Sequence, residues 1–361
     1  MEINDKKARV LELIPFSPTS QSKLSFALRE EVNDTELFLV LSSLVQDGEV
    51  LMSMGVKGPE YYRKWNLEID EERKRLSKEL NTRFSEVIFF PRFDGYVANV
   101  KDNFNFGEYN SILDNFLDVS EEYVLWHRNA KTGLIYPPKL NALSSSTVMS
   151  LNIVNSLGVN NENVIYGANY EVLVPEPMHD RPDEISAPRV LFDAIINYDD
   201  AVDYIQSTFL EQFYQPSKPG LWPFQYGDRF LFDNDEAKEL IHEFSKTLNP
   251  IYFDATDLIK SITAIYSDIL ASPEEYLNKK VHLFKINFEL EENTSFPLLY
   301  DYAKLYNAEG KDLELRINEL LAKLPLPEGV SLEYQFLSLS EVVNTFEEDK
   351  KDYFIKRYFK F

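Results

Sequence analysis

Two carboxylates and two neutral polar side chains lie close together in the sequence between Asp193 and Glu211. Asp193 stands among apolar residues in RVLFDAIINY, and Gln206 and Thr208 follow in AVDYIQSTFLEQF. Both segments have the composition of strands, and the acidic stretch 197–200 between them predicts a tight turn. Because side chains alternate between the faces of a strand, Gln206 and Thr208 share one face. Oxygen-bearing side chains of this kind are suitable ligands for Mg²⁺.

Asp193 also has a structural interpretation that involves no ligand. An aspartate at the end of a strand often closes a turn, and Arg189 is near enough in the sequence to pair with it. The residues around the hairpin are needed to choose between the two interpretations.

The hairpin resembles the core of the restriction-endonuclease-like superfamily, the PD-(D/E)xK nucleases. The stretch YIQSTFLE, which ends at Glu211, lies without a gap over a strand that reads FIESKFTE in one branch, and thirteen positions separate Asp193 from Gln206. Upstream, that branch has a helix with Ser-Ser-Gln and a later Asn, and Ser145, Ser146, Thr147 and Asn152 occupy a similar place. The resemblance spans roughly residues 85–290.

The resemblance implies two carboxylates that hold Mg²⁺ and a lysine beside the attacking water. In this chain Gln206 stands at the Glu position and Thr208 at the Lys position, whereas Asp193 and Glu211 remain. Gln offers an oxygen to Mg²⁺ but no charge, and losing one electrostatic donor typically costs roughly 2.7–4 kcal/mol of barrier. We therefore expect a pseudo-nuclease with Asp193, Gln206, Thr208 and Glu211 at its centre.

An active enzyme would need replacements for the missing groups. Glu211 or Glu171 would supply the second carboxylate, and Lys218 would supply the cation. Mg²⁺, held by Asp193 and Gln206, is then the expected cofactor, and phosphodiester cleavage the expected reaction.

Residues 1–65 are predicted to form three helices followed by a wing. Ser20 and Asn33 are suited to cap the second and third helices, and Gly48 to end the third. EVLMSMG and VKGPEYYRKW follow as the strands of the wing. This order resembles winged-helix domains.

The predicted third helix has few groups that read DNA. It carries Asp34, Glu36 and Asp47 and no Lys or Arg, so cations come only from the wing, at Lys57, Arg63 and Lys64. We favour protein contacts or dimerisation over DNA recognition for this domain, and both interpretations stay open.

The rest of the chain predicts an α/β (α+β) layered fold. Residues 66–83 are charge-rich and predict a solvated connecting helix, and 84–361 interleave strands with helices. The expected architecture is an N-terminal winged helix plus a restriction-endonuclease-like mixed sheet flanked by helices, with a helical C-terminal part.

Composition limits the remaining function classes. The 361 residues carry a formal net charge of −23, which weighs against a broad surface that coats DNA. The absence of cysteine excludes disulfides and thiolate metal sites and fits a cytoplasmic location. No apolar stretch is long enough to span a membrane, so no membrane partner is expected.

Three functions remain as hypotheses. The first is a pseudo-nuclease that acts as a nucleic-acid-binding or assembly component of a prokaryotic restriction or defence system. The others are an active Mg²⁺-dependent DNA endonuclease and a winged-helix transcription regulator. DNA is a more suitable nucleic acid than RNA, and a protein partner or homodimer fits either nuclease-like hypothesis. The candidate nucleic-acid contacts are Ser145, Ser146, Asn152, Lys57, Arg63, Lys64, Lys218 and Arg229.

Overall fold

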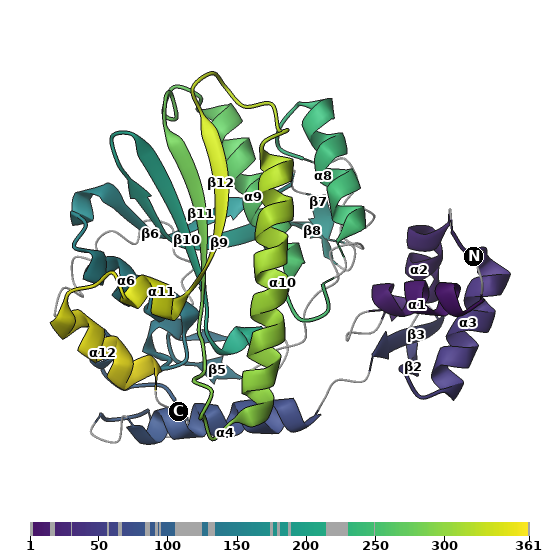
Figure 1. Ribbon diagram of the computed structural model, residues 1–361, viewed down its shortest axis with the longest axis horizontal. Helices are drawn as coiled ribbons and strands as arrows, with labels where there is room; N and C mark the ends of the chain where they lie inside the picture. The colour runs from purple at the N-terminus through teal and green to yellow at the C-terminus, as the bar shows by residue number, and fades with distance from the viewer. Residues whose placement is uncertain are drawn as a thin grey trace.

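The computed structural model shows a mixed α/β protein (Figure 1). It describes residues 3–14, 19–29, 31–55, 58–63, 67–83, 87–90, 93, 95–104, 125–128, 134–173, 176–178, 181–186, 189–213, 230–248 and 250–359. Within these ranges, no helix has the length and apolar character needed to cross a membrane.

The N-terminal residues form a module with its own hydrophobic core, built around Leu24, Leu37 and Leu41. Its elements are α1 (Ile3–Leu13), β1 (Thr19–Ser20), α2 (Gln21–Leu28), α3 (Asp34–Gln46), β2 (Val50–Gly55) and β3 (Gly58–Arg63). The three helices and the hairpin occur where the sequence predicts them, and β1 is an addition that pairs with β3.

Local capping explains where two of these helices begin. The Ser20 hydroxyl accepts a hydrogen bond from the backbone N–H of Lys23 at the start of α2. At the start of α3, the Asn33 side chain accepts from the Glu36 N–H while the Glu36 carboxylate accepts from the Asn33 N–H, which is a capping box. Both caps are at the residues that the sequence predicts.

A five-stranded mixed sheet forms the centre of the remaining chain, in the order β12-β11-β10-β9-β6. The strands β6, β9 and β10 are antiparallel neighbours, whereas β10, β11 and β12 run parallel. Their bounds are β6 (Val164–Glu171), β9 (Arg189–Asn197), β10 (Ala201–Thr208), β11 (Lys280–Asn287) and β12 (Ser331–Ser338). The predicted hairpin is therefore the β9–β10 pair, and β10 ends at Thr208, earlier than its apolar pattern suggests.

The described α-helices of this region are α4 (Leu67–Arg83), α6 (Ser146–Leu157), α8 (Asp235–Thr247), α9 (Ala255–Ala271), α10 (Pro297–Leu321), α11 (Leu339–Val343) and α12 (Glu348–Tyr358). Smaller elements are β4 (His127–Arg128), β5 (Ile135–Tyr136), β7 (Glu176–Met178) and β8 (Arg181–Ser186), and the 3-10 turns η1 (Val100–Asn103), η3 (Lys139–Asn141), η4 (Asn161–Asn163) and η5 (Leu210–Phe213). The sequence of residues 109–129 predicts a helix, but the structure describes only 125–128 of them, where His127–Arg128 form β4.

Helices α6 and α9 cover opposite faces of the sheet. Tyr204 and Gln206 of β10 bond to residues of α9, at Asp268 and Ser261, whereas Ser207 bonds to Ser150 of α6. Because neighbouring side chains of a strand point to opposite faces, the two helices lie on either side of β10. The first turn of α6 and of α9 can therefore approach the same end of the strand from two directions.

Residues 67–83 form the predicted helix, α4, but the prediction that it is only a solvated connector is wrong. Leu76 and Leu80 of α4 are buried in the core of the main domain, and Glu72 accepts hydrogen bonds from the first backbone N–H groups of α10, at Leu298 and Leu299. Two leucines four residues apart form a narrow apolar stripe, which the surrounding charged residues conceal in the sequence. Helix α4 is thus a packed part of the α/β domain.

The C-terminal helix α12 also packs on this domain, with Phe354, Arg357 and Tyr358 buried. The Arg357 guanidinium donates to the backbone carbonyl of Asn103, which joins the end of the chain to the region before α6. The basic, aromatic C-terminal segment thus docks on the core of the α/β domain.

Replacing Leu80 with alanine should lower the free energy of unfolding of the α/β domain by about 2–5 kcal/mol, because the change leaves a cavity in its core. Urea titration followed by circular dichroism would measure the effect, with Lys78→Ala on the exposed side of α4 as the matched control. Equal, small effects of both changes would mean that α4 is only a connector.

Candidate functional site

The sheet splits between β9 and β10, and the split places the residues of interest. The antiparallel ladder ends at the pair Ala194 and Ile205. Beyond this pair β9 continues along β6 to Arg189, while β10 continues along β11 to Thr208. Asp193 and Gln206 are the first residues past the last pair, so they stand where the two strands diverge.

Asp193 accepts three hydrogen bonds at this split, one from the opposite strand and two from α6. Its Oδ1 accepts from the Thr147 hydroxyl at 2.7 Å, and its Oδ2 accepts from the Ser150 hydroxyl at 2.8 Å. Its Oδ2 also accepts from the backbone N–H of Ser207 at 2.8 Å. Two donors come from the first turns of α6 and the third from β10, so the carboxylate replaces a ladder partner that β10 has lost.

Gln206 makes the reciprocal connection. Its amide nitrogen donates to the backbone carbonyl of Leu191 in β9 at 2.8 Å, and its amide oxygen accepts from the Ser261 hydroxyl of α9 at 2.9 Å. Each strand therefore presents a side chain to the backbone of the other. Both side chains are buried, with 5% of Asp193 and 4% of Gln206 exposed.

Glu211 follows in η5 and lies at the N-terminus of α6. Its carboxylate accepts from the Ser146 hydroxyl at 3.0 Å and from the backbone N–H of Phe209 at 2.9 Å. Its pKa is raised, because the protein around the carboxylate desolvates it and because the negative charge of Asp193 adds to the effect.

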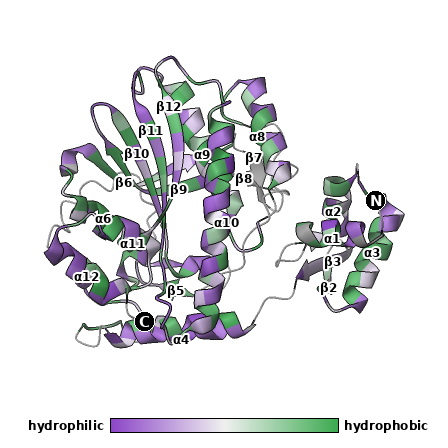
Figure 2. Ribbon diagram, viewed as in Figure 1, coloured by the Kyte–Doolittle hydropathy of each residue, from purple (hydrophilic) through white to green (hydrophobic). Residues whose placement is uncertain are grey.

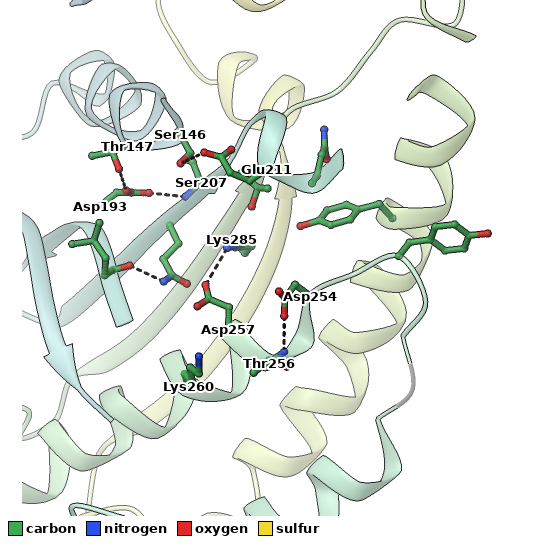
Figure 3. Close-up of a pocket in the computed structure, with 16 residues that line it drawn as sticks. Ser146, Thr147, Asp193, Ser207, Glu211, Asp254, Thr256, Asp257, Lys260 and Lys285 are labelled. Carbon is green, nitrogen blue, oxygen red and sulfur yellow. Dashed lines mark hydrogen bonds and ion pairs between the residues drawn. The ribbon is translucent and has the colours of Figure 1, made fainter. Parts of the chain in front are cut away.

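These groups surround a cavity of about 400 Å³ (Figure 3). In the close-up, the residues of α6 and β9 lie on one side and those of α9 on the other. The charged side chains that line the cavity are Asp193, Glu211, Asp254, Asp257, Lys260 and Lys285. The sequence predicted the first two of these and missed the other four.

Lys285 is the most informative of the residues that sequence reasoning missed. It is paired with Gln206 in the parallel ladder between β10 and β11, so the two residues are adjacent across the strands. Its ammonium group lies 3.9 Å from the Asp257 carboxylate, and its charge favours the ionised form of Asp193. Thr208 supplies no cation at the position where the resemblance implies a lysine, but a lysine from the next strand lines the same cavity.

The four carboxylates outnumber the two lysines, so the cavity is negative when all six groups are ionised. Burial opposes this state: desolvation raises the pKa of Asp193, although its three donors and Lys285 act in the opposite direction. A phosphate group would meet net repulsion here.

The described residues do not form a preorganised set of Mg²⁺ ligands. Both oxygens of Asp193 and the amide oxygen of Gln206 already accept hydrogen bonds from the protein. Among the described residues, no three His, Cys, Asp or Glu side chains are grouped so that they could hold a metal. The expected ligand pair Asp193 and Gln206 is therefore used for internal contacts.

The other predicted residues lie in different places. Ser146 and Thr208 line the cavity, whereas Ser145 caps α6 by accepting from the Val148 N–H. Asn152 is fully buried and donates to the backbone carbonyl of Asn103, so none of its surface is available to a nucleic acid.

Of the charged candidates, Glu171 pairs with Arg189 at 3.0 Å at the outer end of β9 and does not line the cavity. The Arg63 guanidinium donates to the backbone carbonyl of Leu11. The predicted contacts Lys57, Lys64, Lys218 and Arg229 lie outside the described residues.

Replacing Asp193 with asparagine should be tolerated, because the new amide oxygen can accept from Ser207 and Ser150 while its nitrogen donates to the Thr147 hydroxyl. Asp193→Ala leaves these donors unpaired and should lower the free energy of unfolding by about 1–3 kcal/mol. Urea titrations of both variants would measure this. A cost for Asn as large as that for Ala would mean that the negative charge itself is required.

The difference in stability between Asp193→Asn and the natural protein should depend on pH, with a sign that follows from the pKa of Asp193. Because the pKa of Asp193 is raised by folding, the folded state holds this proton more tightly than the unfolded chain. Stability from this group is therefore lost as the pH rises from the unfolded value of about 3.9 through the native pKa. The stability of Asp193→Asn relative to the natural protein should rise over that window and then level off; a fall would contradict the assignment.

Comparison of the chain with protein-family models, with curated proteins and with solved structures found no match in any of the three. A function for the chain must therefore be inferred from the geometry of the split sheet and its cavity.

Proposed function

We propose that this chain is a nuclease-like protein that does not hydrolyse nucleic acid. It acts instead as a nucleic-acid-binding or assembly component of a prokaryotic restriction or defence system, with a degraded PD-(D/E)xK centre in its α/β domain and a winged-helix module before it. The observation that carries the proposal is the reciprocal hydrogen bonding of Asp193 and Gln206, which uses both motif positions to close the split between β9 and β10.

The electrostatics of the cavity argue against hydrolysis. Four carboxylates and two lysines line the cavity. Lys285 forms an ion pair with Asp257 at 3.9 Å, so it is not a freely available cation. Without a bound metal, the net negative charge of this arrangement repels a scissile phosphate and opposes the negative charge that develops during its cleavage. A nuclease mechanism would have to displace the internal hydrogen bonds first.

The cavity nevertheless has a capacity for ligands. Gln212 lines it and donates to the backbone carbonyl of Phe288, while its buried amide oxygen has no hydrogen-bond partner within the described part of the chain. A buried acceptor without a partner is uncommon and favours a water molecule or a ligand donor at this position.

The N-terminal module supports assembly more than DNA recognition. Glu36 of α3 pairs with Lys6 of α1 at 2.6 Å, and Asp47, which caps the end of α3, pairs with Lys7 at 3.0 Å. The surface that remains on α3 includes the exposed apolar side chains of Phe38 and Leu39. Such side chains suit a protein partner better than the hydrogen-bonding edges of bases.

A second candidate function, an active endonuclease, has one observation in its favour. Glu211 and Lys285 line the same cavity as Asp193, so a second carboxylate and a cation are both present near the motif. Of the predicted alternatives, Glu171 pairs with Arg189 and does not line the cavity, and Lys218 lies outside the described residues.

The two candidates differ in metal-dependent cleavage. With Mg²⁺ or Mn²⁺, the natural protein should leave plasmid and single-stranded DNA intact, and so should Asp193→Ala and Lys285→Met. Gel electrophoresis over a time course would measure this. Robust cleavage by the natural protein that disappears in Asp193→Ala would refute the proposal and establish the endonuclease.

Restoring the glutamate should create an affinity for metal. In Gln206→Glu a carboxylate would face the Leu191 carbonyl in place of an amide donor, which should lower the free energy of unfolding by about 1–3 kcal/mol at neutral pH. Mg²⁺ or Mn²⁺ should raise the melting temperature of this variant but not that of the natural protein or of Gln206→Met. A metal-induced shift in the natural protein would argue for a resident ion.

A further inference from the structure

The carboxylates of the cavity beside β10 come from two of its walls. On one side, Asp193 and Glu211 accept hydrogen bonds from hydroxyl groups of α6. On the other side, Asp254 and Asp257 lie at the start of α9 (Figure 3). With the two cavity lysines charged, four carboxylates leave an excess of two negative charges. Charges that are spread over two walls suit a ligand with two separated positive groups better than they suit one small ion.

Two neutral polar groups of the same cavity lack a hydrogen-bond partner within the described part of the chain. Gln212 is only 2% exposed, and the unpartnered atom is its amide oxygen, Oε1. In the first turn of α9, the buried hydroxyl of Thr256 is also without a partner. Both residues line the cavity, and both groups can accept a hydrogen bond. Because buried polar groups are rarely left unsatisfied, a ligand that brings N–H donors fits here.

Helix α9 presents hydrophilic side chains to the cavity. Hydrophilic and hydrophobic residues are interspersed along this helix (Figure 2), and Leu258 and Ile262 are buried in the core of the domain. Thr256, Asp257 and Lys260 line the cavity instead. The packing of the apolar side of α9 therefore fixes the polar wall in place before any ligand arrives.

Aromatic surface completes the cavity, through Tyr252 and Tyr306. The Glu309 carboxylate of α10 accepts hydrogen bonds from the backbone N–H groups of Tyr252 and Phe253, at 2.7 Å and 2.8 Å, and so anchors the segment before α9. Aromatic rings attract cations and also cover methylene groups. The volume of about 400 Å³ is within the range of small-molecule sites and far exceeds the space that one metal ion fills.

We propose that this cavity binds a small organic dication, a linear molecule whose two ammonium groups are joined by methylene groups. One ammonium group faces Glu211 on the side of α6, and the other faces Asp254 and Asp257 on the side of α9. The N–H groups of the ligand donate to Gln212 and Thr256. The inference deepens the proposed function and rests on it in one respect, which is that no Mg²⁺ ion resides in the cavity.

The energetics of the empty cavity are consistent with such a ligand. Burial raises the pKa of both Asp193 and Glu211, so the protein alone stabilises their charges poorly. A cation between the walls favours the ionised carboxylates and removes their mutual repulsion. A metal ion is less suitable, because no three acidic or histidine side chains among the described residues are grouped around one point.

Isothermal titration calorimetry of the full chain with putrescine tests the proposal. One molecule should bind per chain. Glu211→Gln and Asp257→Asn, one change on each wall, should each raise the dissociation constant by about tenfold or more. In Glu211→Gln the new amide can still accept from the Phe209 N–H and donate to the Ser146 hydroxyl, so the fold is retained. Asp199→Asn is the matched control, because it removes one charge from the exposed turn at the far end of β10.

Contrary results in these titrations overturn the proposal. Binding that does not saturate, or that Asp199→Asn weakens equally, would mean that the amine interacts only with the acidic surface. Nα-acetyl-lysine methylamide, with one ammonium group, should bind about tenfold more weakly; an equal affinity would indicate a lysine side chain of a partner protein. Displacement of putrescine by Mg²⁺ at a lower ionic strength than NaCl requires would place a metal ion in the cavity.

A change without any effect on charge provides a second readout. Thr256→Val replaces the unpartnered hydroxyl with a methyl group and should raise the dissociation constant about threefold to tenfold, with an unaltered melting temperature showing that the variant is folded. An unchanged dissociation constant would contradict the inference. Plasmid cleavage is measured separately: a protein that cleaves DNA and binds the diamine refutes only the proposed function, whereas one that does neither refutes only this inference.

Discussion

The paired hydrogen bonds between β9 and β10 are the constraint on which the rest of the candidate site depends. Two strands that diverge leave backbone groups without ladder partners, and buried groups of this kind must find others. The Asp193 carboxylate binds the Ser207 N–H, and the Gln206 amide binds the Leu191 carbonyl. These two side chains satisfy backbone groups that the divergence leaves without ladder partners, so both are engaged in hydrogen bonds within the protein.

The helices on either face turn the split into a cavity. Helix α6 contributes Thr147 and Ser150 to Asp193, and α9 contributes Ser261 to Gln206, so each motif residue is anchored by a different helix. A carboxylate with three donors can stay buried at an acceptable energetic cost, whereas an isolated one cannot. The same hydrogen bonds that stabilise Asp193 limit the chemistry it can perform, which connects the energetics of the fold with the proposed loss of hydrolysis.

The edge strands of the large and the small sheet differ in how far other residues cover them. The large sheet is closed at β12 by side chains of α10, and Gly310 allows this helix to approach so closely that any side chain there would collide with the Phe336 ring. The small sheet leaves β2 open and lines it with methionines.

The sequence by itself determined the features that depend on neighbours in the chain. These include the capped starts of α2 and α3, the β9–β10 hairpin, and the proximity of Asp193 and Gln206, which a tight turn imposes on two adjacent strands. Tertiary structure alone decided the rest of the site. Lys285 and Asp257 reach the cavity through a parallel register and a helix packed on the sheet, and neither leaves a local pattern. The burial of α4 escaped prediction for the same reason, since two leucines among charges become a core contact only when a distant helix covers them.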